Sequence, residues 1–132
     1  MKIVIDTNVV IQGVFFGSAP RRVISAVVNR QIEAVASPEI IEEYQEIVDE
    51  MIDRKQGKLE RSLLAPFISE LELIEPVSEI VECRDPDDDK FISCAVDAKA
   101  AIIVSGDKDL LTIGTYEGVE IMTAYDFCKK YL

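Results

Sequence analysis

The segment KIVID, residues 2–6, is a short apolar run that ends in a carboxylate. Such a run is typical of a parallel strand that is buried on both faces. Similar short runs recur at residues 32–37, 101–107 and 118–123, and helix-like segments separate them. Strands that alternate with helices predict an α/β fold around a central parallel sheet.

Helix signals fill most of the space between the expected strands. A helix is expected from Ser18, and a second one begins at Ser37 as the cap with Pro38 at its first position. Further helices are expected within residues 57–71, kinked or broken at Pro66, within residues 90–100, and from Thr123 to the end. Residues 71–77 are a candidate third strand, and residues 7–18, with two glycines, are expected to form a loop. The chain shows no repeat or linker, so we expect one domain over residues 1–132.

The composition indicates a soluble globular protein, with 48% apolar and 30% charged residues. No apolar run approaches the length that crosses a bilayer, and Asp6 interrupts the first one, which argues against a signal peptide. We therefore expect a cytoplasmic protein that does not enter a membrane. The cysteines are Cys83, Cys94 and Cys128, an odd number without a CxxC pair, and we expect them to be reduced.

The charge balance excludes some function classes. Fourteen Lys and Arg against 25 Asp and Glu give 14 − 25 = −11, whereas a generic nucleic-acid binder is expected to be basic. Either the partner is not nucleic acid, or metal cations neutralise part of the acidic groups. The chain has no histidine, which excludes Ser-His-Asp and Cys-His catalysis and removes the commonest general base.

Three carboxylates fall where an α/β site is expected, beyond the carboxyl ends of strands. Asp6 follows the first strand, and Asp107 and Asp109 follow the strand at residues 101–105. For either position alone, a turn former or helix cap is the favoured explanation. Glu43 adds a fourth, because it lies at the edge of the apolar stripe of the helix after Ser37 and can reach a cleft beside the core.

The stretch CRDPDDDKF, residues 83–91, crowds four aspartates in front of a helix. Capping explains one or two of them, and Asp85 and Asp87 suit that role. Asp88 lies above the buried stripe of the helix, whereas Asp89 points about 100° away; both are candidate ligands. Carboxylates that converge without His or Cys suit Mg²⁺ or Mn²⁺, and such a site performs phosphoryl transfer with a metal-bound water in place of a side-chain base.

Four blocks in order resemble the PIN-domain nucleases, and in particular stand-alone prokaryotic PIN proteins described as toxins of toxin–antitoxin pairs. The blocks are VIDTNV (4–9), SPEIIEE (37–43), RDPDDDKFISCA (84–95) and IVSGDKDLL (103–111). The resemblance implies a Rossmann-like three-layer α/β/α sandwich and an endoribonuclease that cleaves single-stranded RNA with Mg²⁺ or Mn²⁺. It also implies two candidate protein partners, an antitoxin and a second copy of the chain.

The resemblance assigns roles residue by residue. Asp6, Glu43, Asp88 and Asp107 match the metal-binding and catalytic acids, Asp109 matches a frequent additional ligand, and Asp89 competes with Asp88 for the third block. Thr7 and Asn8 match polar residues that support the first aspartate. Ser105 stands where the family often has Thr, and both carry a hydroxyl group.

A basic stretch after the helix at Ser37 bears on the substrate. Arg54, Lys55, Lys58 and Arg61 are candidate contacts to an RNA backbone, although an ordinary solvated segment explains them more simply. One rival function is a degenerate PIN module that binds RNA or a partner protein without cleaving. The other is a different Mg²⁺-dependent phosphoryl enzyme, such as a small phosphatase, which the missing second Asp after DTN and the lack of a Gly-rich loop disfavour.

Overall fold

A six-stranded sheet forms the centre of the computed structural model, which describes residues 1–55 and 61–132. Its strand order is β3-β2-β1-β4-β6-β5. β1 (Lys2–Ile5) lies between β2 (Glu33–Ala36) and β4 (Ile102–Val104), and β6 (Val119–Met122) and β3 (Glu72–Leu73) extend the sheet on either side. These strands are parallel, and only the edge strand β5 (Thr115–Tyr116) is antiparallel. The predicted α/β fold with a mainly parallel sheet is confirmed.

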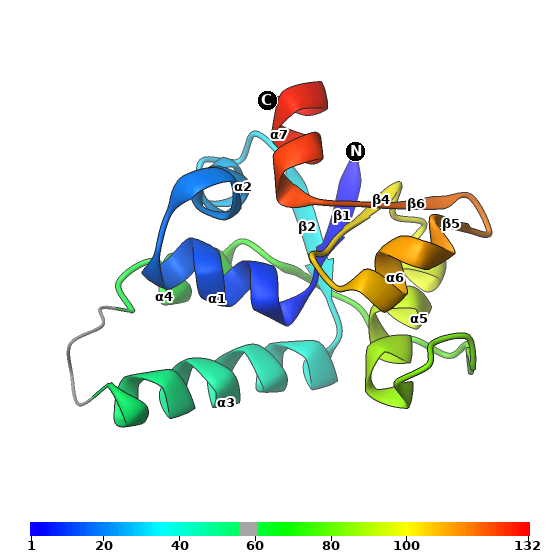
Figure 1. Ribbon diagram of the computed structural model, residues 1–132, viewed down its shortest axis with the longest axis horizontal. Helices are drawn as coiled ribbons and strands as arrows, with labels where there is room; N and C mark the ends of the chain where they lie inside the picture. The colour runs from blue at the N-terminus through cyan, green and yellow to red at the C-terminus, as the bar shows by residue number, and fades with distance from the viewer. Residues whose placement is uncertain (56–60) are drawn as a thin grey trace.

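Helices cover both faces of the sheet (Figure 1). On one side lie α1 (Thr7–Phe15), α2 (Ser18–Val28), α4 (Leu64–Ser69) and α7 (Ala124–Tyr131). On the other lie α5 (Asp89–Ala98) and α6 (Lys108–Ile113), with the short 3₁₀ turn η1 (Pro86–Asp88) before α5. α3 (Pro38–Arg54) starts where β2 ends and contacts both α1 and α5, so it passes along the carboxyl edge of the sheet.

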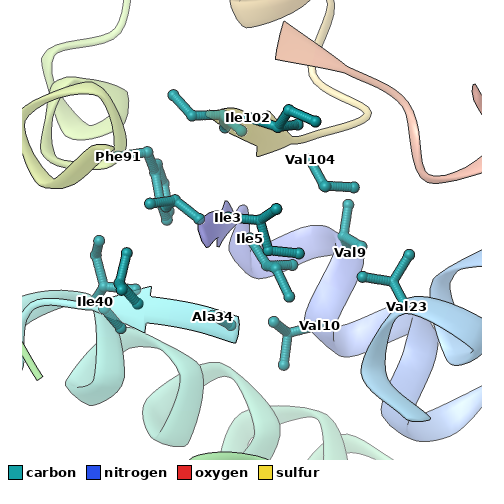
Figure 2. Packing of buried hydrophobic residues seen from close by; sticks show 14 of the residues in the cluster. Ile3, Ile5, Val9, Val10, Val23, Ala34, Ile40, Phe91, Ile102 and Val104 are labelled. Atoms are coloured by element: carbon teal, nitrogen blue, oxygen red, sulfur yellow. The ribbon is translucent and has the colours of Figure 1, made fainter. Parts of the chain in front are cut away.

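The apolar strands are buried on both faces, as parallel strands require. Figure 2 shows Phe91 of α5 on one side of β1, and Val10 and Val23 on the other. Ile3 and Val4, which project to opposite faces, are both fully buried. Burial of this kind is the main stabilising contribution, and it fixes β1 so that its carboxyl end, with Asp6, has a defined place.

Residues 7–15 form a helix, and the predicted loop is wrong. The carbonyl oxygen of Asp6 accepts hydrogen bonds from the N–H groups of Val9 (3.0 Å) and Val10 (3.2 Å), which starts α1. Gly13, which suggested a loop, is a packing residue, because a Cβ there would lie 2.5 Å from Cγ1 of Ile24 on α2. Tertiary burial therefore overrides the weak helix propensity of valine and glycine.

The helix caps and most other elements follow the sequence signals. Ser37 accepts a hydrogen bond from the N–H of Ile40 (3.2 Å) and Thr123 accepts one from the N–H of Asp126 (3.1 Å). Of the helix predicted within residues 57–71, residues 57–60 lie outside the described residues, and the described remainder contains only α4. Pro66 does not kink α4, because proline is tolerated in a first turn. The third predicted strand is reduced to two residues, and β5, α6 and η1 were not predicted.

Two further expectations concern the cysteines and the membrane. All three cysteines are free, and burial, as the largest cause, raises the pKa of Cys83 and Cys94 to about 12, so these thiols stay protonated at neutral pH. Within the described ranges, none of the helices combines the length and the apolar character that crossing a bilayer requires.

Candidate functional site

Asp6 lies at the carboxyl end of the central strand and is only 5% exposed. Its Oδ2 accepts a hydrogen bond from the hydroxyl of Ser105, 2.7 Å away at the end of the neighbouring strand β4. Burial raises the pKa of Asp6, the hydrogen bond from Ser105 opposes this, and the negative charges of Asp107 and Glu43 add to the rise. Asp6 is thus a buried carboxylate whose pKa is raised further by two carboxylates from different segments.

Asp107 follows β4 and caps α6. Its Oδ1 accepts hydrogen bonds from the N–H groups of Asp109 (2.7 Å) and Leu110 (3.4 Å), while its own N–H donates to Oγ of Ser105 at 3.0 Å. The fully buried Ser105 therefore links the ends of β1 and β4. Asp107 can therefore cap α6 and still present Oδ2 beside Asp6, because only Oδ1 accepts the capping hydrogen bonds.

Asp88 and Asp89 have different surroundings. Burial raises the pKa of Asp88 to about 6, and the charges of Asp107, Asp6 and Asp85 contribute in that order, against Lys90. Asp89 instead turns its Oδ1 to the N–H groups of Cys83 (2.7 Å) and Glu82 (3.1 Å). Burial alone would raise the pKa of Asp89, but these hydrogen bonds outweigh burial and lower it. Asp88 is therefore the aspartate of the pair that shares a field with Asp6 and Asp107.

Glu43 comes to the same edge from α3, and both of its oxygens are engaged. Oε1 lies 2.9 Å from Nζ of Lys90, and Oε2 accepts a hydrogen bond from the hydroxyl of Thr7. The neighbouring side chain of Tyr44 is fully buried and donates to the carbonyl oxygen of Ile5, which fastens α3 to the end of β1. The negative charge of Glu43 is thus balanced by Lys90, and Lys90 and Thr7 hold its side chain in place.

Lys90 is the site residue that sequence reasoning missed. Its side chain is only 10% exposed, and Nζ also lies 2.6 Å from the carbonyl oxygen of Asp87. A lysine in the first turn of a helix gives no sign that it will pair with a glutamate 47 positions earlier in the chain. The sequence contained one weak signal, since Lys90 directly precedes the run FISCA (91–95), every residue of which is buried in α5.

The remaining predicted residues lie at the margin of the site. Asp109 is partly buried, and its Oδ1 lies 4.0 Å from Nη1 of Arg84. The side chain of Asn8 is exposed and lines a hollow beside α7. Of the supporting residues, Thr7 and Ser105 thus contact predicted site acids, Glu43 and Asp6 respectively.

The donor chemistry suits a hard divalent cation, since it consists of carboxylate oxygens without His or Cys. Burial raises the pKa of Asp6 and of Asp88, and mutual repulsion adds to both; a cation would relieve that repulsion. In residues 1–55 and 61–132, however, no three acidic or cysteine side chains stand close enough together to enclose an ion as arranged. The site is therefore an open acidic centre, consisting of Asp6, Asp88 and Asp107, beside the internally paired Glu43.

Comparison with known proteins agrees with the motif order. The family profile described as the PIN domain matches residues 2–109. An uncharacterised protein of Methanocaldococcus jannaschii is 34% identical over 117 residues, which cover 86% of this chain and 75% of the relative. No solved structure matches the chain significantly. The chain belongs to the PIN-domain family, whose members are typically nucleases.

Proposed function

We propose that this chain is a divalent-metal-dependent endoribonuclease that cleaves single-stranded RNA. The observation that carries the proposal is the acidic centre, where Asp6, Asp88 and Asp107 from three separate segments share one electrostatic field at the carboxyl edge of the sheet. Membership of a family of nucleases supports the reaction class. The choice of RNA over DNA rests on the resemblance of the motifs.

Asp6, Asp88 and Asp107 would hold Mg²⁺ or Mn²⁺. A bound divalent cation supplies Lewis acidity and lowers the pKa of a water for attack on a phosphodiester, which suits a protein without histidine. Ser105 keeps the carboxylate of Asp6 oriented, and the Asp107 cap on α6 fixes the second acid. Lys90 places a positive charge beside Glu43 and lowers the repulsion that an incoming phosphate meets.

Purified protein with a labelled, unstructured RNA strand tests the proposal. We expect cleavage in Mn²⁺, none in excess chelator, and none with Asp6→Asn. Asp53→Asn is the matched control, since it makes the same chemical change on an exposed part of α3. Hydrolysis of a simple phosphomonoester in place of RNA would instead indicate a phosphatase.

A second candidate function is a PIN module that binds RNA or a partner protein without cutting. The pairing of both Glu43 oxygens favours it, because that carboxylate would have to leave Lys90 and Thr7 before it could ligate a metal. Tight RNA binding without cleavage in Mg²⁺ or Mn²⁺ would establish this alternative and contradict the nuclease.

We also propose a toxin role, with an antitoxin protein as partner, as the resemblance to stand-alone PIN proteins implies. Induced expression of the wild-type chain should then arrest bacterial growth, and expression of Asp6→Asn should not. Equal growth with both proteins, at equal protein levels, would contradict the toxin role while leaving the nuclease proposal to its own test.

A further inference from the structure

The proposed function leaves a question about charge, because a chain of net charge −11 must still hold a polyanion. The basic stretch expected from the sequence does not answer it well. Arg61 is paired with Asp49, and Lys58 lies outside the described residues. Arg54 is 11 residues along α3 from Glu43, which places it on nearly the same helical face but roughly 16 Å away along the axis.

A groove between α2 and α7 is lined at its inner end by residues that lie close to two acids of the acidic centre in the chain. Its inner part is a hollow of about 380 Å³ whose lining includes Asn8, Gly106 and Thr123. Asn8 is two residues after Asp6, and Gly106 directly precedes Asp107. An outer hollow of about 690 Å³ shares Ser18, Ala19 and Tyr125 with the inner one. The two hollows are thus one groove, and Figure 1 shows α7 beside α2 along this course.

The two parts of the groove differ in chemistry. The inner hollow has mainly apolar walls, the exposed amides of Asn8 and Gln12, and the ring of Tyr125, which is 67% exposed. An exposed aromatic ring is a platform on which a nucleobase stacks, and side-chain amides can bond to base edges. The inner hollow therefore suits one unpaired base.

The outer hollow is basic. It is lined by Arg22 and Lys129, both exposed, and Lys129 is one helical turn from Tyr125 on the same face of α7. Across residues 1–55 and 61–132, no carboxylate lies within ion-pair distance of either cation. The neighbouring Arg21 is not available, because its guanidinium donates to the carbonyl oxygens of Gly13 and Val14, both at 3.0 Å.

We propose that the α2–α7 groove holds the single-stranded RNA that flanks the cleaved bond. One base stacks on Tyr125 with its edge at Asn8 and Gln12, and backbone phosphates lie against Arg22 and Lys129. This inference rests on the proposed nuclease function and adds its substrate-binding surface. The place of Asn8 and Gly106 in the inner hollow, close to Asp6 and Asp107 in the chain, and the cations Arg22 and Lys129 in the outer one favour RNA over a second copy of this chain as the occupant.

The test compares two double charge reversals, Arg22→Glu with Lys129→Glu, and Arg54→Glu with Lys55→Glu. Each changes the net charge by the same amount, so a difference between them reports position and not total charge. Affinity for a fluorescent single-stranded RNA is measured in chelator, and KM and kcat are measured in Mn²⁺.

The groove reversal should weaken affinity at least about 10-fold, raise KM, and reduce the slope of log affinity against log salt by about 1.4, as two lost contacts to single-stranded RNA predict. The reversal on α3 should leave affinity within about twofold. Tyr125→Ala should weaken binding about 10-fold, and Tyr125→Phe should restore it, since stacking needs the ring and not the hydroxyl.

Three results would overturn the inference. If the wild type cleaves RNA but both reversals bind equally well, the groove is wrong and the nuclease stands. If the groove reversal turns a dimer into a monomer with unchanged RNA affinity, the groove is a contact between copies. If the wild type neither binds nor cleaves RNA, the proposed function and the inference both fail.

Discussion

The acidic centre and the neighbouring Glu43 differ in how their negative charge is balanced. On the strand side, Asp6 and Asp107 are linked through Ser105, a hydroxyl that brings no positive charge. On the helix side, Glu43 has the ammonium of Lys90 at 2.9 Å. The protein therefore balances the charge of Glu43 by itself, whereas under the proposed function a divalent cation would balance the charge of Asp6 and Asp107. A carboxylate at the edge of a site is therefore a better candidate metal ligand when no cationic side chain pairs with it.

The largest effect should come from removing charge in the acidic centre. Asp6→Asn should lower RNA cleavage by more than about 100-fold, the upper range for disturbing groups that only support a metal ligand. The same change should raise the melting temperature in chelator, since it removes a buried carboxylate that two others repel. Cleavage activity and melting temperature are measured on one protein preparation. A melting temperature that falls together with the activity would contradict the prediction.

Removing the internal cation should sharpen the contrast between the acidic centre and Glu43. Lys90→Met leaves Glu43 without its partner, which should cost about 2 kcal/mol of unfolding free energy, below the usual range for a buried pair because Glu43 is partly exposed. The double variant Lys90→Met with Glu43→Gln should recover most of that loss. Urea unfolding in chelator measures the cycle, and equal losses in the single and double variants would refute the pairing.

The adjacent Asp88 and Asp89 should give opposite dependences on pH in the metal-free protein. The raised pKa of Asp88, about 6, means that the folded state binds more protons than the unfolded state above pH 4, so its contribution to stability falls as pH rises through 4 to 6. The lowered pKa of Asp89 gives a contribution that is present above its usual pKa and lost as pH falls below it. At pH 7, Asp88→Asn should therefore raise the melting temperature and Asp89→Asn should lower it.

Melting curves from pH 3 to pH 8 decide between these signs. The wild type minus Asp88→Asn difference should change between pH 4 and pH 6, whereas the difference for Asp89→Asn should change only below pH 4. Similar curves for the two variants would mean that the aspartates do not have separate roles.

The smallest effect is expected where α3 is fastened to β1. Tyr44→Phe removes the hydrogen bond to the carbonyl oxygen of Ile5 and should cost about 1 kcal/mol of unfolding free energy. Because Glu43 is the preceding residue, cleavage should fall severalfold as its position loosens. A loss of stability without any change in cleavage would show that Tyr44 serves the core alone.

Local signals explain which parts of the fold could be predicted. The apolar strands and the caps Ser37 and Thr123 were predictable, because each depends on residues within a few positions of one another. α1 was not, because Val9 and Val10 disfavour a helix and Gly13 reads as a turn until its contact with Ile24 is known. That contact depends on how two helices pack, which no local pattern contains.

The same distinction separates the two parts of the site. Asp6, Asp107 and Asp88 could be placed from strand ends and helical spacing, and the structure brings them into one field. The partners of Glu43 lie 36 and 47 positions away in the chain, so these contacts could not be predicted from the sequence. Arg22 and Tyr125, which line one hollow, are 103 positions apart and also meet only in the folded chain. Helical spacing separated Asp88 from Asp89 in direction but left both as candidate ligands, and the hydrogen bonds that Asp89 accepts from the N–H groups of Cys83 and Glu82 separate their roles.

The anomalous signal of manganese in a crystal soaked in Mn²⁺ tests the central claim most directly. We expect a peak bound by Asp6, Asp88 and Asp107, absent from Asp6→Asn crystals and present in Asp53→Asn crystals. A peak at Asp89, or no peak at the acidic centre while the protein still cleaves RNA, would contradict this claim.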